Sequence, residues 1–272
     1  MNSFGRFNLS EISLSRLLLA LKVRMDEIPH AFAWQFHPLA RKNKEYIQKF
    51  QGIHRGERCF IVANGPSLKK TNLDLLADEY TFGLNRIYLN FENSSFRPTY
   101  CVTINELILE QCANEISQLG MPKFLNWNRR SYYGNPDPKT IFLKSKMVIK
   151  DSFEYDLTHP MVFGATVTFV ALQIAYYMGF QKVILIGLDH NYTDKGTPSR
   201  TETRTSEQDE SHFHAQYFPK GFKWQLPDLL RSEIEFEIAR KAFEAGGREI
   251  LDATMGGKCQ VFNKIDYLSL FD

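Results

Sequence analysis

The sequence predicts an α/β fold, in which helices cover both faces of a mostly parallel sheet. From residue 58 onward, short apolar runs alternate with longer runs of helical periodicity. The clearest of the short runs, 58–62 and 182–187, lack polar alternation, as is typical of strands buried on both sides. The chain has 272 residues, of which 43% are hydrophobic, so it is long enough to bury such a Rossmann-like sheet.

Composition narrows the class of protein. The formal net charge is +2, but residues 1–56 hold 9 Lys and Arg against 4 Asp and Glu. The remainder is slightly acidic, and we expect no nucleic-acid partner. The four cysteines have no CxxC spacing, and no Cys/His pattern resembles a zinc site. We therefore expect reduced thiols, a cytoplasmic protein and no bound metal.

The first predicted domain, residues 1–56, contains an amphipathic helix over 8–28 and an aromatic connector over 31–50. The apolar residues of the helix recur at the spacing of one face: Leu9, Ile12, Leu17, Leu18, Leu21, Met25 and Ile28. Such a face needs a cover, either a partner subunit in a homo-oligomer, the main domain, or an anionic membrane surface. No run reaches the roughly 18 apolar residues of a membrane span, so contact with the inner membrane face would be peripheral.

The second predicted domain, residues 57–272, begins with the most informative stretch. Its first strand ends in Asn64, Gly65, Pro66 and Ser67, a tight turn at the carboxyl end of the strand. Gly65 permits both a close approach of the backbone and a positive φ, and Pro66 presets the next φ. Ser67 can cap a following helix whose free N–H groups attract a phosphate. A purely structural strand-to-helix turn would use the same residues.

Asparagines follow three of the predicted strands. Further strands are expected over 80–85, 99–105, 122–127 and 140–143, with a helix over 106–119. Asn64, Asn85 and Asn105 each stand at or near a strand end. Because ligands of open parallel sheets sit outside the carboxyl ends of the strands, we expect the three carboxamides in one crevice. There they could bind a base, a ribose or a phosphate.

The second half of the chain repeats this arrangement. Gly164, Ala165 and Thr166 open an apolar helix that runs through Met178, and the strand 182–187 leads to Asp189. The helix start predicts either a second anion site or a simple N-cap. Asp189 could accept hydrogen bonds from sugar hydroxyls, hold a metal or act as a base, and an Asx-turn is the structural alternative. A helix over 228–245 and a strand over 248–251 follow.

Residues 190–226 are polar and poorly periodic, and we predict that they form a lid over the site. The segment contains His212 and His214. We expect these histidines to act as a general base or to contact a phosphate rather than to bind a metal. A solvated loop is the structural alternative.

The motifs together resemble a known family. The chain is similar to bacterial proteins with domain of unknown function 115, the MptE-like group related to archaeal 6-hydroxymethylpterin diphosphokinase. It is more distantly similar to the CMP-sialic-acid-dependent sialyltransferases of glycosyltransferase family 42, and the similarity covers residues 58–262. Those sialyltransferases surround CMP with five motifs, which match 64–68, Asn85, Asn105, 164–168 and 187–189 here. The resemblance implies a sialyltransferase-like variant of the GT-A fold with a nucleotide pocket.

The catalytic region departs from the sialyltransferase pattern. Those enzymes carry two histidines four residues apart, with a Tyr after the first, and the second histidine deprotonates the acceptor. Here His212 matches the first, Phe213 replaces the Tyr, and Gln216 stands where the base would fall. His214 is the candidate base from a shifted position, with His212 as the other candidate. By the same resemblance, Tyr192 and Tyr217 would steady the leaving phosphate.

Three hypotheses follow. The first is a glycosyltransferase that needs no cofactor and transfers a CMP-activated nonulosonate-type sugar to a cell-surface glycan acceptor. The second is a diphosphokinase that acts on a pterin alcohol with ATP and Mg²⁺ held near Asp189. The third is a non-enzymatic, nucleotide-binding assembly module that uses residues 8–28 for its contacts.

Overall fold

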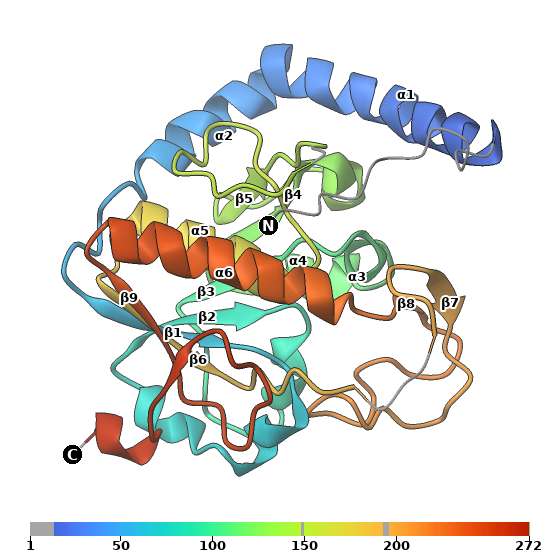
Figure 1. Cartoon of the computed structure of the whole chain (residues 1–272). Coiled ribbons are helices and arrows are strands. Elements are labelled where there is room, and N and C mark those ends of the chain that lie inside the picture. Colours follow the sequence, from blue (N-terminus) through green and yellow to red (C-terminus); the bar gives the residue numbers. More distant parts are fainter. Residues whose placement is uncertain (1–13, 148–149, 193–195, 272) are drawn as a thin grey trace, which may run out of the picture. The chain divides into compact units, whose positions relative to one another are not determined.

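The predicted α/β fold is confirmed in the computed structural model, which describes residues 14–147, 150–192 and 196–271 (Figure 1). Within these residues an eight-stranded sheet has the order β10-β9-β6-β1-β2-β3-β4-β5. All of its neighbouring strands pair in parallel. The strands are β1 (Arg58–Val62), β2 (Tyr80–Leu84), β3 (Tyr100–Thr103), β4 (Lys123–Asn126), β5 (Thr140–Leu143), β6 (Lys182–Ile186), β9 (Glu249–Asp252) and β10 (Asn263–Lys264).

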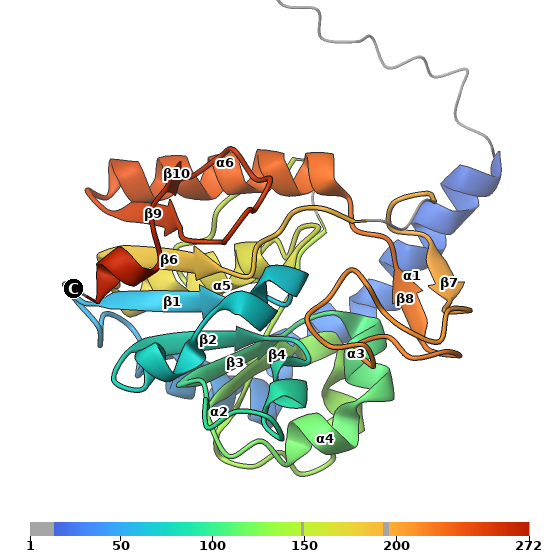
Figure 2. The ribbon, with the colours of Figure 1, turned by 90° about the horizontal axis from the view of Figure 1, so that it is seen from below.

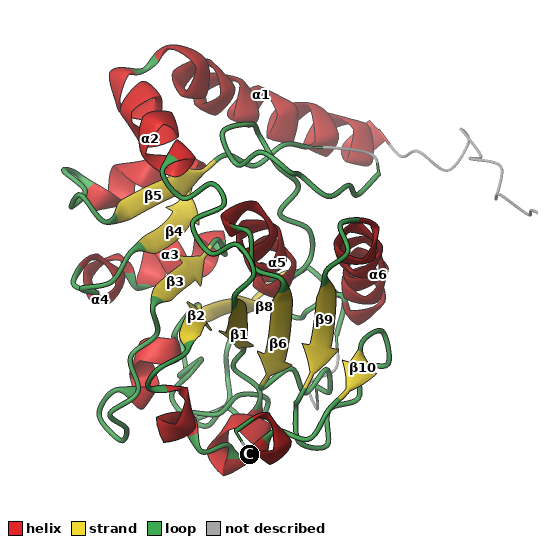
Figure 3. Ribbon diagram, turned by 90° about the vertical axis from the view of Figure 1, so that its left-hand side faces the viewer, coloured by secondary structure: helices red, strands yellow, loops and turns green. Residues whose placement is uncertain are grey.

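The sheet is buried because helices and short 3-10 turns flank it. Helix α5 (Val167–Met178) packs on β1, β2 and β3, and α6 (Leu229–Ala245) packs on α5 and β9. Figure 3 shows α5 and α6 above the sheet and the C-terminal segment below it. There Phe271 stacks on Phe60, with ring centroids 5.8 Å apart. The apolar strand runs predicted this double burial correctly.

Several element boundaries differ from the prediction. The helix expected over 106–119 is two short helices, α3 (Glu106–Gln111) and α4 (Ala113–Ser117). The backbone leaves the helical region at Cys112, with φ −124°, where the side chain is buried. The turn after β1 leads into a 3-10 helix, η2 (Pro66–Lys70), rather than an α-helix.

The N-terminal prediction also needs correction. The connector expected over 31–50 is helical, because α1 (Leu14–Phe36) continues past Pro29 and α2 (Pro38–Gln48) begins with a proline at its first position, where no N–H is needed. Residues 8–13 of the predicted helix lie outside the described residues. The chain forms two compact units, 1–42 and 43–272, whereas the boundary predicted from the sequence was residue 56. None of the described helices has the length and apolarity to cross a bilayer.

Candidate functional site

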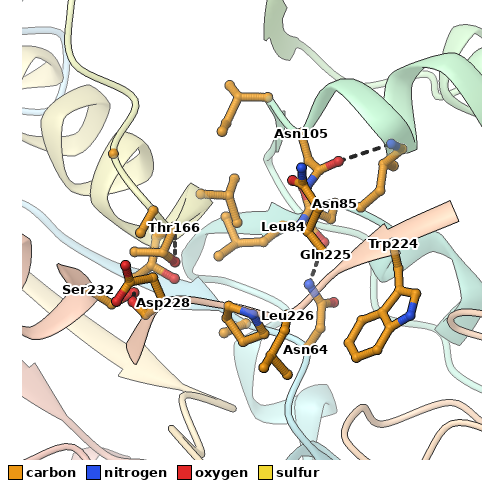
Figure 4. Close-up of a pocket in the computed structure, with 18 of the residues that line it drawn as sticks. Asn64, Leu84, Asn85, Asn105, Thr166, Trp224, Gln225, Leu226, Asp228 and Ser232 are labelled. Atoms are coloured by element: carbon orange, nitrogen blue, oxygen red, sulfur yellow. Dashed lines mark hydrogen bonds between the residues drawn. The ribbon is translucent and has the colours of Figure 1, made fainter. Parts of the chain in front are cut away.

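A cavity of about 640 Å³ opens at the carboxyl ends of the strands, within the unit 43–272. The chain leaves β1 toward β2 on one side and returns through α5 to β6 on the other, so the direction of strand succession reverses between β1 and β6. In open parallel sheets this reversal creates the crevice in which ligands bind. The volume lies within the range of small-molecule sites. Figure 4 shows the asparagines and, on another side, Thr166, Asp228 and Ser232.

Asp189 joins the loop after β6 to the turn after β1. Its Oδ1 accepts from the Ser67 amide at 3.0 Å, and its Oδ2 accepts from the Ser67 hydroxyl at 2.6 Å. Ser67 therefore binds Asp189 instead of capping a helix, and neither Pro66 nor Ser67 lines the cavity. Both oxygens of Asp189 accept hydrogen bonds from this turn. The carboxylate therefore links the loops after β1 and β6 at the switch point, the place where the strand order reverses.

Gly65 is required for one of the two predicted reasons, the close approach of another segment of the chain. Its φ is −70°, which any residue adopts, so the expected positive φ is wrong. A Cβ at this position would lie 1.9 Å from Asp189 Oδ2 and 2.7 Å from the Gly187 carbonyl oxygen. The close approach of the two loops at the switch point therefore excludes any side chain here.

Asn64 presents a hydrogen-bond acceptor to the cavity wall. Its Nδ2 donates to the Leu84 carbonyl at 2.9 Å, and since a carbonyl only accepts, this bond sets the orientation of the amide (Figure 4). Its Oδ1 is buried and has no hydrogen-bond partner among the described residues. A buried acceptor without a donor is costly, so a ligand that supplies an O–H or N–H would be favoured here.

Asn85 and Asn105 use their amides differently. Asn85 has a positive φ of 46°, and its Oδ1 is buried without a partner in the described part of the chain. Asn105 caps α3, since its Oδ1 accepts from the Leu107 and Ile108 amides. All three predicted asparagines line the cavity. The side-chain oxygens of Asn64 and Asn85 are buried without a partner among the described residues, whereas that of Asn105 is used in the cap.

The start of α5 holds an internal carboxylate. Glu235 of α6 is fully buried, and both of its oxygens lie 2.9 Å from the Ala165 amide nitrogen. Gly164, at φ 69°, leaves the space for it, because a Cβ there would lie 2.3 to 2.5 Å from the carboxylate. Thr166 is an N-cap whose hydroxyl accepts from the Thr168 amide. We expected the Ala165 amide to bind a ligand anion, but it donates its hydrogen bond to Glu235 instead.

We predicted a lid over 190–226, and several described residues of this segment line the cavity and are packed rather than loose. The segment contains a two-stranded antiparallel sheet, β7 (Thr201–Thr203) and β8 (Lys223–Gln225) (Figure 2). Four aromatic side chains of the segment are buried: Phe213, Tyr217, Phe218 and Trp224. Hydrogen bonds to neighbouring elements anchor the segment. The Phe213 amide donates to the Asn64 carbonyl at 2.8 Å, and the buried Arg86 donates to the Gln216 and Tyr217 carbonyls.

His212 lies in the cavity wall as half of a His–Asp pair. Its Nδ1 lies 2.9 Å from Asp209 Oδ2, and both side chains are buried. Burial acts to raise the pKa of Asp209, but the hydrogen bond and charge of His212, the Ser211 amide and Arg204 together lower it. An ionised Asp209 accepts from an N–H on Nδ1, so the neutral form of His212 has its lone pair on Nε2. This is the tautomer of a general base.

The remaining predicted residues differ in their access to the cavity. His214 does not line it, and its Nδ1 accepts from the Gln216 amide at 3.1 Å. Tyr217 lines it and stacks on His212 with ring centroids 4.0 Å apart, while burial raises the pKa of its hydroxyl far above the ordinary range. Tyr192 lines it and lies edge-on to His212.

Backbone strain is concentrated around the cavity. In the described residues, the non-glycine residues with positive φ are Asn85, His190 and Ser199, at 46°, 53° and 62°. All three line the cavity. Such conformations persist where the surrounding structure enforces them, and they cluster at ligand sites. This distribution supports the cavity as the functional site independently of its sequence motifs.

The sequence interpretation missed several charged residues of the cavity wall. Glu106 and Arg129 form an ion pair at 2.6 Å, and Arg231 is paired with Asp151 at 2.7 Å and with Glu235 at 3.0 Å. Glu106 directly follows Asn105, and a search for polar residues just beyond strand ends would have found it. Arg231 and Glu235 lie inside a helix of mixed charge, where nothing in the sequence separates them from solvent-exposed neighbours.

A metal site is not evident in the geometry. Across the described residues, no three His, Cys, Asp or Glu side chains come together as a set of ligands. Asp189, the predicted neighbour of Mg²⁺, has both oxygens bound to Ser67. The residues around Asp189 therefore do not fit a protein-bound Mg²⁺ ion as they stand.

A comparison with protein-family models identifies a family for the chain. A family model described as "6-hydroxymethylpterin diphosphokinase MptE-like" matches residues 35–195, more than half of the chain. None of the curated proteins compared with the chain matches it. A similar solved structure is the "MAf glycosyltransferase from Magnetospirillum magneticum AMB-1", with 11% identity and a TM-score of 0.48. The match covers 84% of this chain but 38% of that chain, so this chain spans well under half its length.

Substitution of Gly65 should show how tightly the switch point is built. Gly65→Ala should lower the free energy of unfolding by about 1–3 kcal/mol, because the added Cβ must displace both Asp189 and the Gly187 carbonyl. Gly120→Ala is the matched control, since its Cβ would meet nothing within 4 Å. Urea unfolding followed by fluorescence measures both. Equal stability of the two variants would contradict the close contact.

The buried carboxyl of Glu235 should make stability depend on pH. Burial raises its pKa from 4.5 to about 7, although the Ala165 amide and Arg231 oppose the rise. The folded chain holds this proton more tightly than the unfolded chain, so the group contributes stability that is present near pH 4.5 and lost as the pH rises through 7. Glu235→Gln should remove this loss, on the order of 1–3 kcal/mol between pH 5 and pH 8.

Urea unfolding at several pH values tests this expectation. Glu237→Gln, an exposed carboxylate of the same helix, should follow the pH dependence of the wild type. Parallel curves for the wild type and Glu235→Gln would show that the buried carboxyl does not titrate in this range.

Proposed function

Since the chain belongs to the family of 6-hydroxymethylpterin diphosphokinase MptE-like proteins, we propose that it is a transferase whose nucleotide donor binds in the cavity between the ends of β1 and β6. The donor is a CMP-activated sugar of the nonulosonate type, and the acceptor is a hydroxyl of a cell-surface glycan. The choice of CMP rests on the sequence resemblance of the five motifs to the sialyltransferases of family 42. The observation that carries the catalytic part is the His212–Asp209 pair in the cavity wall.

The unpaired oxygens of Asn64 and Asn85 favour the nucleoside part of a donor. Both are acceptors, so they suit the ribose hydroxyls or the exocyclic amino group of a base rather than a phosphate. They lie at the ends of adjacent strands, β1 and β2. Both oxygens are buried in this structure, so a nucleoside would satisfy them once the two side chains turn toward it; the described residues supply no donor to either.

The charge of the cavity wall favours a donor with few phosphates. Among its described residues, Arg129 and Arg231 are the cationic side chains, and both are already paired with carboxylates. Glu106, Asp189 and Asp228 are the acidic ones. A CMP-sugar carries a single phosphodiester and needs less positive charge than a nucleoside triphosphate does.

His212 is the proposed base in place of His214. In the transfer step, Nε2 of His212 takes the proton of the acceptor hydroxyl, and the acceptor oxygen forms a bond to the anomeric carbon. The bond from that carbon to the phosphate oxygen breaks, and CMP leaves with the electron pair. Asp209 holds the tautomer of His212 and stabilises the positive charge that the ring acquires.

A diphosphokinase is the second candidate, because the matching family model carries that description. In this reaction the cavity would take ATP, and a pterin alcohol would receive the diphosphoryl group. Mg²⁺ would have to arrive on the phosphates, since Asp189 is bound to Ser67. The two candidates therefore differ in nucleotide and in dependence on Mg²⁺.

Thermal shift with nucleotides distinguishes these candidates. CMP at saturating concentration should raise the Tm by several degrees without Mg²⁺. Asn64→Ala should reduce this shift, because it removes an acceptor for the nucleoside, whereas Asn72→Ala, which alters the cap of a distant 3-10 helix, should leave it unchanged. A response to ATP with Mg²⁺ and none to cytidine nucleotides would favour the diphosphokinase.

Substitution of the two histidines tests the base. His212→Gln should lower the rate of transfer or hydrolysis of a CMP-sugar at least about 100-fold and leave the CMP-induced Tm shift in place. His214→Gln should keep most of the activity, because His214 does not line the cavity. If both variants keep full activity, neither histidine is the base. If the wild type binds nucleotide but transfers nothing, the non-enzymatic assembly module becomes the better explanation.

A further inference from the structure

Helix α1 carries a stripe of exposed apolar side chains, which we name the α1 stripe. Its members are half to two-thirds exposed: Leu21 at 54%, Met25 at 60%, Ile28 at 65%, Phe32 at 65% and Phe36 at 67%. The rings of Phe32 and Phe36 contact each other, with centroids 4.6 Å apart. Single exposed apolar residues are ordinary on a protein surface, but a contiguous row of five large ones marks an interaction site.

The spacing of the α1 stripe is that of a coiled-coil seam. From Leu21 to Phe32 the steps are four, three and four residues. In the sequence the same alternation continues backward to Leu18 and Leu14. A repeat of 3.5 residues gives a narrow seam that fits one partner helix, whereas the face of a helix packed on a domain core is wider. The pattern therefore favours another helix of the same kind as the occupant.

Charge favours a protein partner over a membrane surface. In the sequence of α1, Arg16, Lys22 and Arg24 stand against Asp26 and Glu27, so the charges nearly balance at a net +1. A helix that lies on an anionic bilayer is rich in Lys and Arg on its polar face. A balanced helix attracts such a surface weakly, and it does not repel a copy of itself.

The area of the α1 stripe approaches what a dimer needs. Five large side chains exposed to this degree offer on the order of 600 Å² of apolar surface. A stable pair of proteins buries about 800 Å² on each partner, and the flanking residues of a 23-residue helix would supply the rest. Two-fold symmetry lets one such stripe cover its own copy, so a single surface completes the interface.

We propose that two copies of this chain pair through the α1 stripe in a two-helix coiled coil. The inference is independent of the proposed function, because no residue of α1 lines the cavity. The second copy covers the apolar face that the sequence predicted to need a partner.

The test measures the mass of the full chain in solution. At micromolar concentration, light scattering or sedimentation equilibrium should give twice the 31.6 kDa of one chain. The double variant Met25→Glu with Ile28→Glu should give a single chain, because it places charges in the seam. The matched control is Lys22→Ala with Arg24→Ala, which lowers the net charge by the same two units without altering the α1 stripe, and it should stay dimeric.

Other results would overturn the proposal. A monomeric wild type, or a double variant that remains dimeric, would show that α1 does not pair with its copy. A monomeric wild type that sediments with vesicles of anionic lipid would assign the α1 stripe to a membrane surface. Phe32→Glu is a second variant in case the double variant unfolds. Circular dichroism and the Tm confirm that a dissociated variant is folded, and its unchanged Tm shift with nucleotide separates dimer formation from ligand binding.

Discussion

The contact between Ser67 and Asp189 is the interaction on which the site depends. It joins two loops 122 residues apart in sequence at the point where the strand order reverses. The close approach requires glycine at position 65 and brings Asn64 to the cavity wall. The Asn64 carbonyl in turn accepts from the Phe213 amide, so the covering segment is fixed to the same turn. One pair of hydrogen bonds thus aligns the floor and the cover of the cavity.

Two carboxylates of the protein occupy positions where we expected a ligand's phosphate. Asp189 takes the N–H and O–H of Ser67, and Glu235 takes the amide of Ala165 at the start of α5. Among the described residues of the cavity wall, the buried polar atoms without a hydrogen-bond partner are the amide oxygens of Asn64 and Asn85 and the Nε of Arg129. The two oxygens, at the ends of β1 and β2, are acceptors and suit the hydroxyl and amino groups of the proposed donor. This explains why we place the nucleoside, and not the phosphate, at the ends of β1 and β2.

The covering segment combines a rigid interior with reactive polar groups. Its aromatic side chains are buried, and Arg86 holds its carbonyls from below. This packing fixes His212 between Tyr217 and Asp209, so the orientation of the imidazole does not depend on a ligand. For the proposed role of His212 as a base, this arrangement would avoid the cost of ordering a loose loop.

The sequence by itself determined the class of fold, most of the strands and the turn at the end of β1, because apolar runs and turn residues act locally. It also placed Asn64, Asn85 and Asp189 at strand ends, and parallel strands bring such ends to one edge. Only the tertiary structure decided which polar atoms are used internally and which remain unpaired. Asn105 caps α3, and Ser67 binds Asp189. His212 is hydrogen-bonded to Asp209, whereas His214 does not line the cavity. The role of Glu235 could not be predicted from the sequence either, because α6 meets the start of α5 only in the folded chain. A carboxylate in a helix of mixed charge is expected to be solvent-exposed, and only the packing shows that Glu235 is buried.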